Sequence, residues 1–272
     1  MDSLTDLETR MNVSPSLPSK SEMEKFYRHA MSSGDFFVAL ADKKIIGFSG
    51  AIIRDTLWFL SAFWVLPSFQ KSGIGFSLLE RVYEKGVSRG ASVFCVYSSS
   101  DFPALASYMK MGMFPGYPVF YFEGTPKRAS FSEANSPRSE ELQEGIATEL
   151  DLEIRGVDRL TDHRYWKSLG SRAVQIEIEG TMAGYYYVRE GFIGPVVSKQ
   201  SKDMELLLNL AIKDAVDFSP NKNITLMVPG INHLALKWIL KTGFRIRSTS
   251  HFLTSKKFGN LTNYLPSGPG LY

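Results

Sequence analysis

The residues with the clearest chemical potential in this sequence are Gln70, Gly73 and Gly75, which form a Gln-x-x-Gly-x-Gly stretch. The stretch lies between an apolar run over 57–66 and a run over 75–89 in which apolar residues recur at helical spacing. Glycines at a strand-to-helix turn adopt backbone conformations closed to other residues. The first N–H groups of the helix lack intrahelical partners, and the helix dipole makes that end positive. The stretch therefore predicts a turn that binds a phosphate through main-chain donors, with a purely structural turn as the alternative.

The elements that must position this turn follow from the hydrophobic pattern on both sides of it. Apolar and aromatic runs separated by short polar turns predict a meander of three strands before the turn. Helical spacing and a continuous apolar run predict a helix, a strand and a second helix after it. The expected elements are a helix over 21–31, strands over 35–40, 45–53 and 57–65, a helix over 75–89, a strand over 91–97, a helix over 101–111 and a strand over 114–122.

The second half of the chain looks like a worn copy of the first. Residues 101–112 align with 232–243 and keep Ala, Leu, Lys and Gly at matching positions. Upstream, Ile46-Gly47-Phe48 matches Ala183-Gly184-Tyr185, and a helix is expected over 204–216. The region between these matches is shorter in the second copy and has no Gln-x-x-Gly-x-Gly stretch. The alternative is an unrelated α+β domain with a chance match.

The amino-acid composition favours an ordered globular protein and gives no support for nucleic-acid or membrane binding. The 272 residues are 44% hydrophobic and 13% aromatic, which is enough for ordered cores. The net charge is only +3 and no long basic stripe occurs, so neither nucleic-acid nor membrane binding has electrostatic support. The N-terminal residues lack the apolar core of a signal peptide, and no run of 18 apolar residues follows, so we expect a cytoplasmic protein.

Neither the cysteine nor the histidines predict a special site. Cys95 is the only cysteine and lies in an apolar run, where a buried and inert thiol is expected. The four histidines are isolated from one another and show no ligand spacing, so no metal site is expected.

The glycine stretch, with Val65 and Pro67 before it, resembles the acetyl-CoA-binding signature of the GNAT superfamily of N-acetyltransferases. The expected order of elements is similar to the GNAT fold over about residues 20–123. The resemblance implies an α/β (α+β) chain of two tandem GNAT-like domains, each a mostly antiparallel, splayed sheet flanked by helices. We expect a first domain over 1–123, a linker over 124–150 with a helical turn near Glu140, and a degenerate copy over 151–272.

The same resemblance implies the residues of the site. Asp101, Ala104, Tyr108, Gly112 and Met113 stand where the family has Asn-x-x-Ala-x-x-x-Tyr-x-x-x-Gly-Phe, so Asp101 and Met113 depart from the pattern. Tyr108 matches the general acid of the family, and the Val65 N–H is the candidate oxyanion donor. Ile239 occupies the tyrosine position in the second copy. The residues expected to bind acetyl-CoA are Phe63, Trp64, Val65, Gln70, Lys71, Ser72, Gly73, Ile74, Gly75, Phe76 and Asp101.

The function implied is transfer of an acetyl group from acetyl-CoA to a primary amine by direct attack in a ternary complex. The acceptor is expected to be a small-molecule or peptide amine, and neither its identity, the acyl preference nor the oligomeric state (a homodimer is one possibility) can be read from the sequence. The run over 57–66 has no carboxylate, so the general base is a water, Asp101 or a carboxylate of the second half such as Glu177 or Glu179. The alternative is a non-catalytic acyl-CoA-binding or partner-binding module.

The second half also offers aromatic residues that could shape an acceptor pocket. These are Trp166 and the run Tyr185-Tyr186-Tyr187. Ordinary packing of alternating strand side chains is the other interpretation of the same residues.

Overall fold

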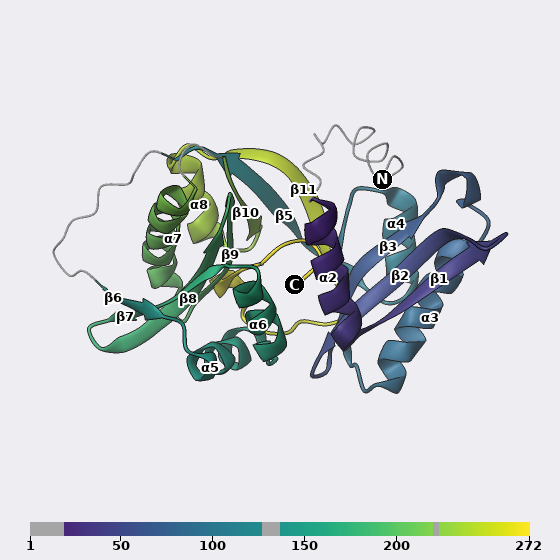
Figure 1. Cartoon of the computed structure of the whole chain (residues 1–272), viewed down its shortest axis with the longest axis horizontal. Helices are drawn as coiled ribbons and strands as arrows, with labels where there is room; N and C mark the ends of the chain where they lie inside the picture. Colours follow the sequence, from purple (N-terminus) through teal and green to yellow (C-terminus); the bar gives the residue numbers. More distant parts are fainter. Residues whose placement is uncertain (1–18, 127–136, 220–222) are drawn as a thin grey trace. The chain divides into compact units, whose positions relative to one another are not determined.

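The computed structural model describes residues 19–126, 137–219 and 223–272 (Figure 1). The chain forms two compact units. Unit 1 is Met1–Gly116 together with His251–Lys256, and unit 2 is Tyr117–Ser250 together with Lys257–Tyr272. Each unit has its own sheet strands and its own hydrophobic core.

Unit 1 begins with a helix and a three-stranded antiparallel meander, as the sequence predicts. Each element predicted for residues 20–123 is present, with ends that agree within two residues. The elements are α2 (Lys20–Ser33), β1 (Gly34–Ala41), β2 (Lys44–Arg54), β3 (Leu57–Val65), the 3-10 turn η1 (Pro67–Phe69), α3 (Ile74–Ser88), β4 (Val93–Ser98), α4 (Phe102–Lys110) and the start of β5 (Phe114–Gly124).

The position of α3 on the sheet is fixed by a close contact at its C-terminal end. The Trp58 indole is buried in the unit 1 core, and its Nε1 donates to the carbonyl of Val82, 3.3 Å away. A Cβ on Gly86 would lie 2.7 Å from Trp58 Nε1 and closer still to Cδ1, so only glycine lets the helix approach the indole this closely. Because β3 starts at this contact and α3 ends there, the N-terminus of α3 lies where β3 ends.

The partner of β4 on its other edge comes from the far end of the chain. The C-terminal half of β11 (Arg245–Thr254) pairs with β4, with His251 opposite Ser98 and Thr254 opposite Cys95. The strand β5 pairs instead with β10 (Ile224–Pro229) in unit 2. The expected division at residue 123 therefore does not coincide with the compact units. Both strands follow an equivalent helix of the repeat, so local pattern alone does not decide which of them pairs with β4.

Unit 2 has the strand order β5-β10-β9-β8-β7-β6, with β12 paired to β9 outside this order. Buried side chains of α7 and α8 form a core with one face of the sheet, whereas α5 and α6 accompany the other face (Figure 1). The remaining elements are β6 (Arg138–Glu141), α5 (Glu144–Arg155), α6 (Leu160–Ser168), β7 (Arg172–Ile178), β8 (Thr181–Arg189), β9 (Phe192–Ser198), the 3-10 turn η2 (Ser201–Asp203), α7 (Met204–Phe218), α8 (His233–Lys241), the 3-10 turn η3 (Leu261–Asn263) and β12 (Tyr264–Leu265).

The stretch 124–150 is not a linker over its whole length. Residues 127–136 of it lie outside the described residues, but Arg138–Glu141 is the strand β6 rather than a helical turn near Glu140. The helix α5 then begins at Glu144. The free edge of β7 accepts β6, with Arg138 opposite Glu177, and this pairing outweighs the polar composition of the segment.

The repeat is visible in the order of elements. The order β8, β9, α7, β10, α8, β11 reproduces the order β2, β3, α3, β4, α4, β5. The turn before α7 is shorter and ends on Asp203 at φ −88°, whereas α3 begins after Gly73 in the left-handed region. The second copy therefore keeps the frame and lacks the glycine turn, as the sequence predicts. No helix among the described residues is long and apolar enough to cross a membrane.

The Trp58 contact predicts opposite effects for two glycine-to-alanine changes in helices. Gly86→Ala should lower the free energy of unfolding by about 1–3 kcal/mol, because the new methyl group overlaps the buried indole. Gly145→Ala in α5, where a Cβ meets no atom within 4 Å, should raise it by up to about 1 kcal/mol. Urea denaturation measures both. An equal gain in the two variants would contradict the packing described here.

Candidate functional site

The turn between β3 and α3 has the backbone conformation that the glycine stretch predicts. Lys71 and Gly73 both have positive φ, at 63° and 86°. The helix starts immediately after, with the Ser77 N–H donating to the Gly73 carbonyl at 3.1 Å. A Cβ on Gly73 would meet no atom within 4 Å, and the first turn of α3 carries no acidic residue. The first N–H groups of α3 thus face unobstructed space with nothing negative beside them.

Two side chains hold the loop before the helix. Gln70 Nε2 donates to the Val65 carbonyl at 3.0 Å, and Ser72 Oγ donates to the Phe69 carbonyl at 2.6 Å. The first bond ties the loop back to the last residue of β3. Gln70 therefore fixes the distance between the end of the strand and the start of the helix.

The two central strands of unit 1 separate beside this turn. β3 pairs in parallel with β4 from Leu57 opposite Val93 to Leu60 opposite Val96. The ladder between β2 and β3 shifts at this point, so Ser61 is an extra residue on β3. A bulge of this kind bends a strand and ends its pairing. From Ala62 to Val65, the described residues give β3 a strand partner only on the β2 side.

Main-chain donors point into this opening. The Leu66 N–H donates to the Ile46 carbonyl at 2.8 Å, which lies on the β2 side. Successive residues of a strand present their N–H and C=O groups to opposite sides. The N–H of Val65 therefore points away from β2, and the same alternation applies to Phe63. This is the direction that the predicted role of Val65 requires.

Phe63 connects the turn with the helix α4. A Cβ on Gly75 would lie 3.2 Å from Phe63 Cζ, so glycine at 75 lets α3 begin against this ring. The same ring makes an edge contact with Tyr108, with centroids 6.2 Å apart. The structure therefore brings the glycine turn, the end of β3 and Tyr108 into one cluster, although they are distant in sequence.

Tyr108 is almost fully buried, and burial raises the pKa of its phenol well above the ordinary value. The negative charge of Asp101 raises the pKa further. The phenol therefore stays protonated at neutral pH and can donate a proton but not accept one. Asp101 precedes α4, but its side chain makes no capping hydrogen bond.

Trp64 is oriented differently from its neighbours. Its ring packs on Phe48, with centroids 6.0 Å apart, and Phe48 in turn meets Tyr27 of α2. Strand alternation places this ring on the opposite face from Phe63. The remaining predicted residues lie around the opening or the turn: Phe63, Val65, Gln70, Lys71, Ser72, Gly73, Ile74, Gly75 and Phe76.

A known family of proteins matches the part of the chain that contains the glycine turn and Tyr108. Residues 1–113 match the model of the acetyltransferase (GNAT) family. This match covers less than half of the chain and includes the glycine turn and Tyr108. No curated protein matches the sequence.

Solved structures of GNAT proteins share the fold over most of this chain. A putative acetyltransferase from Pyrococcus horikoshii is 17% identical with a TM-score of 0.77, over 94% of this chain and 87% of that one. A tandem GNAT protein from the clavulanic acid biosynthesis pathway is 16% identical with a TM-score of 0.63, over 89% of each chain. A GCN5-related N-acetyltransferase from Sphaerobacter thermophilus is 13% identical with a TM-score of 0.68, over 93% and 90%. At these identities the likeness shows the fold alone.

One titratable group of unit 1 lies beside the end of β4, where the sequence did not indicate it. His251, on β11, lies opposite Ser98, and its Nε2 is 3.3 Å from Ser100 Oγ just after β4. The alignment of 232–243 with 101–112 was the available signal, because it makes β11 the counterpart of β5. Among the described residues, no group of three or more His, Cys, Asp or Glu is placed to hold a metal ion.

The residues of the second half that were candidates for the general base or the acceptor pocket contact other residues of unit 2 or lie in its turns. Glu177 approaches Arg138, with 3.9 Å between the charged atoms, and Glu179 has positive φ in the turn between β7 and β8. Trp166 is buried, as are the three tyrosines of 185–187. The interpretation of these aromatics as surface for an acceptor pocket is therefore wrong, because their rings are buried within unit 2, Tyr186 in its core and the other three around His163. Cys95 is buried, as expected.

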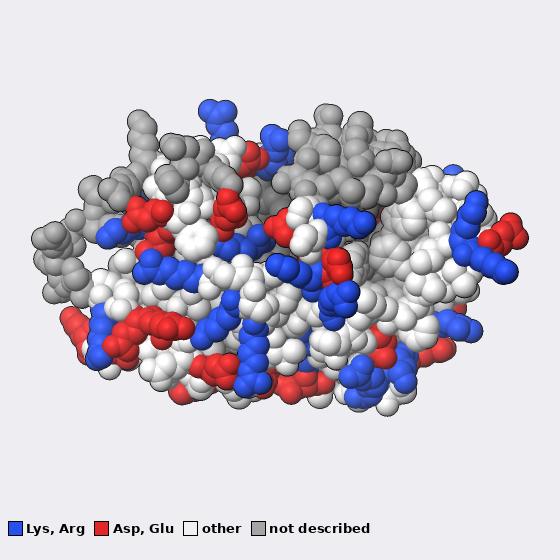
Figure 2. Space-filling view, viewed as in Figure 1, with Lys and Arg blue, Asp and Glu red and all other residues white. Residues whose placement is uncertain are grey.

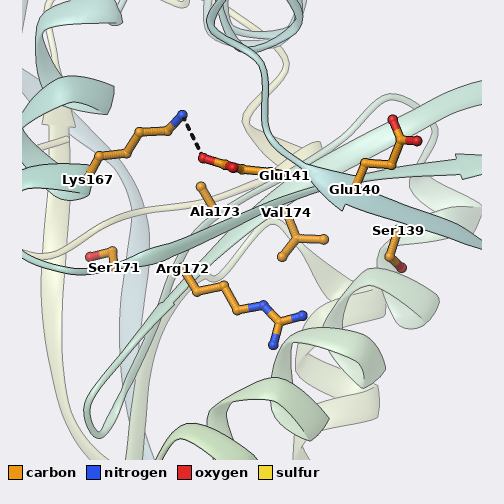
Figure 3. A pocket seen from close by; sticks show the side chains of 8 residues that line it. All are labelled: Ser139, Glu140, Glu141, Lys167, Ser171, Arg172, Ala173 and Val174. Carbon is orange, nitrogen blue, oxygen red and sulfur yellow. Dashed lines mark ion pairs between the residues drawn. The ribbon is translucent and has the colours of Figure 1, made fainter.

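A hollow of about 360 Å³ on unit 2 lies along β6, β7 and the end of α6 (Figure 3). Its lining includes Glu140, Glu141, Lys167 and Arg172. Lys167 Nζ is 3.7 Å from a Glu141 oxygen, so opposite charges offset each other across the hollow. It belongs to a different unit from the glycine turn and has no excess positive charge for a phosphate.

Basic and acidic side chains are interspersed over the face shown in Figure 2. This face has no broad field of one sign, in keeping with the low net charge of +3. The electrostatic attraction of an anionic ligand therefore has to come from local groups such as the N-terminus of α3.

The raised pKa of Tyr108 predicts a measurable effect in alkali. In the unfolded chain the phenol ionises at about pH 10, whereas in the fold it stays protonated. Its contribution to stability is therefore complete below pH 10 and is lost as the pH rises further. Tyr108→Phe should make the fall in unfolding free energy between pH 10 and 11 shallower by up to about 1.4 kcal/mol. Urea denaturation at several pH values tests this, and parallel slopes in parent and variant would contradict it.

Proposed function

We propose that unit 1 binds acetyl-CoA and transfers its acetyl group to a primary amine of a small-molecule or peptide acceptor. The observation that supports this most directly is the continuous cluster of glycine turn, unpaired edge of β3 and buried Tyr108. The family match over 1–113 supports acetyl transfer in general terms. The choice of acetyl-CoA and of an amine is part of the proposal.

Acetyl-CoA supplies the activated acetyl thioester. The main-chain N–H groups from Lys71 to Gly75 bind its pyrophosphate, because they are free of intrahelical partners and lie at the positive end of α3. The edge of β3 from Ala62 to Val65 that faces away from β2 binds the extended arm by main-chain hydrogen bonds, as an added strand would. Glycine at position 75 avoids a tight contact, since a Cβ there would lie 3.2 Å from Phe63 Cζ.

Two groups then act on the reacting atoms. The Val65 N–H donates to the thioester oxygen, where negative charge develops. Tyr108 donates its proton to the departing thiolate, a role that requires a protonated phenol, and its raised pKa ensures this state at neutral pH. No carboxylate lies on β3, so the amine proton passes to water or to Asp101.

Binding is tested by thermal stability with and without acetyl-CoA. A ligand at 100 times its Kd should add about 2.7 kcal/mol to the stability of the parent. Gly75→Glu should abolish this gain, because it puts a carboxylate against Phe63 and the pyrophosphate site. Gly145→Glu is the matched control, since residue 145 is exposed in α5 with open space around it. Equal gains in both variants would remove the turn from the binding site.

Catalysis is tested by Tyr108→Phe. Turnover, followed as free thiol released across a panel of amines, should fall by about 10²-fold, as for loss of a general acid. The KM for acetyl-CoA should stay unchanged, because the ring still packs on Phe63. Tyr83→Phe is the control, since that ring stacks on Phe94 instead. Unaltered turnover in Tyr108→Phe would exclude the phenol from the mechanism.

A second candidate is a non-catalytic acyl-CoA-binding or partner-binding module on the same frame. The absence of a carboxylate on β3 favours it. A stability gain with acetyl-CoA but no thiol release with any amine would decide for this alternative.

A further inference from the structure

The second copy of the repeat has the same opening as the first. β9 is the counterpart of β3, and its parallel pairing with β10 is confined to Phe192 and Ile193, although β9 continues to Ser198. The ladder with β8 also shifts here, since Val196 and Ile193 are successive partners on β9. Both copies therefore bend the same strand away from its parallel neighbour.

In unit 2 this opening holds the C-terminal segment, which we define as residues 257–272. Its strand β12 pairs with β9 inside the opening, with Tyr264 opposite Val197 and Leu265 opposite Val196. Tyr264 and Leu265 are fully buried. The main-chain edge that is unpaired on β3 is thus covered on β9 by the chain itself.

The same segment covers the turn that replaces the glycine turn. Asn263 Nδ2 donates to the Lys199 carbonyl at 3.2 Å, and Asn263 Oδ1 accepts from Ser201 Oγ at 2.6 Å. Lys199 and Ser201 lie between β9 and α7, where unit 1 has the loop that leads to Gly73. One segment therefore occupies both the strand edge and the adjoining turn.

Two buried arginines hold the segment against unit 2. An Arg159 N–H donates to Tyr264 Oη at 2.6 Å, and the Arg155 guanidinium lies 4.4 Å from the centre of the Tyr264 ring. Arg155 also donates to the main-chain oxygen of Tyr272 at 2.7 Å and lies 3.9 Å from the centre of its ring. Buried guanidinium groups require such partners, because desolvation without them is costly. The contacts are specific for the two tyrosines of the segment.

We infer that the C-terminal segment is a permanent occupant of unit 2, in the place where unit 1 takes the arm of acyl-CoA. Unit 2 is accordingly a binding site for an extended peptide, occupied in cis, and the chain binds one acyl-CoA rather than two. The inference rests on the proposed function only for the ligand of unit 1. The pairing of β12 with β9 belongs to unit 2 alone.

The test uses the full chain with the recognition sequence of a specific protease inserted between Lys256 and Lys257, which are both exposed. The protein is folded first and then cut, and native gel filtration shows whether the peptide 257–272 stays bound. We expect it to remain at micromolar concentration. Tyr264→Ala should weaken its retention about a hundredfold or more, because a fully buried aromatic ring is lost. Thr262→Ala is the matched control, since Thr262 is exposed and its hydroxyl bonds within the segment.

Two results would overturn the inference. One is release of the parent peptide while the circular dichroism of the remaining protein is unchanged. The other is binding of two acetyl-CoA molecules per intact chain in calorimetric titration. Binding of no acetyl-CoA by a chain that retains the peptide would count against the proposed function of unit 1, while the assignment of the C-terminal segment to the opening of β9 would stand.

Discussion

In both units, one central strand has a bulge, and the main-chain groups beyond this bulge need hydrogen-bond partners other than the neighbouring parallel strand. The strands are β3 in unit 1 and β9 in unit 2. β3 leaves β4 after Leu60, and β9 leaves β10 after Ile193. Unpaired strand edges are unfavourable when they are shielded from water, and they readily accept an added strand. In unit 2 the chain supplies that strand as β12. In unit 1 the edge adjoins a glycine turn, and the proposed binding of acyl-CoA rests on these two neighbouring features.

Contacts along α3 hold the glycine turn, the end of β3 and Tyr108 in position. The contact between Trp58 and Gly86 sets the closest approach of α3 to the sheet. At the other end of the helix, the hydrogen bond from Gln70 to the Val65 carbonyl holds the loop against the end of β3. Phe63 then fills the space between the first turn of α3 and Tyr108. Tyr108 consequently lies in a desolvated position, which raises its pKa and keeps it a proton donor.

The repeat explains why strands far apart in sequence lie next to each other. The strand that follows the last helix of each copy pairs with the other copy. β11, which follows α8, pairs with β4, and β5, which follows α4, pairs with β10. In this exchange β4 and β10 each gain an antiparallel partner for their main-chain hydrogen bonds. It also places His251 beside Ser100 at the end of β4, a neighbour that the order of elements within the first 123 residues does not provide.

The sequence by itself determined the elements of unit 1, the glycine turn and the repeat, because hydrophobic periodicity and glycine positions are local signals. Its resemblance to the GNAT motifs also implied roles for Tyr108 and Val65, which stay predictions. Only the tertiary structure decided which strands pair, that Arg138–Glu141 is a strand, and that Tyr185 and Tyr187 are buried. Only the fold revealed that residues 264–265 cover β9. These outcomes depend on edges and surfaces contributed by segments far apart in the chain, and no local pattern records which of them will meet.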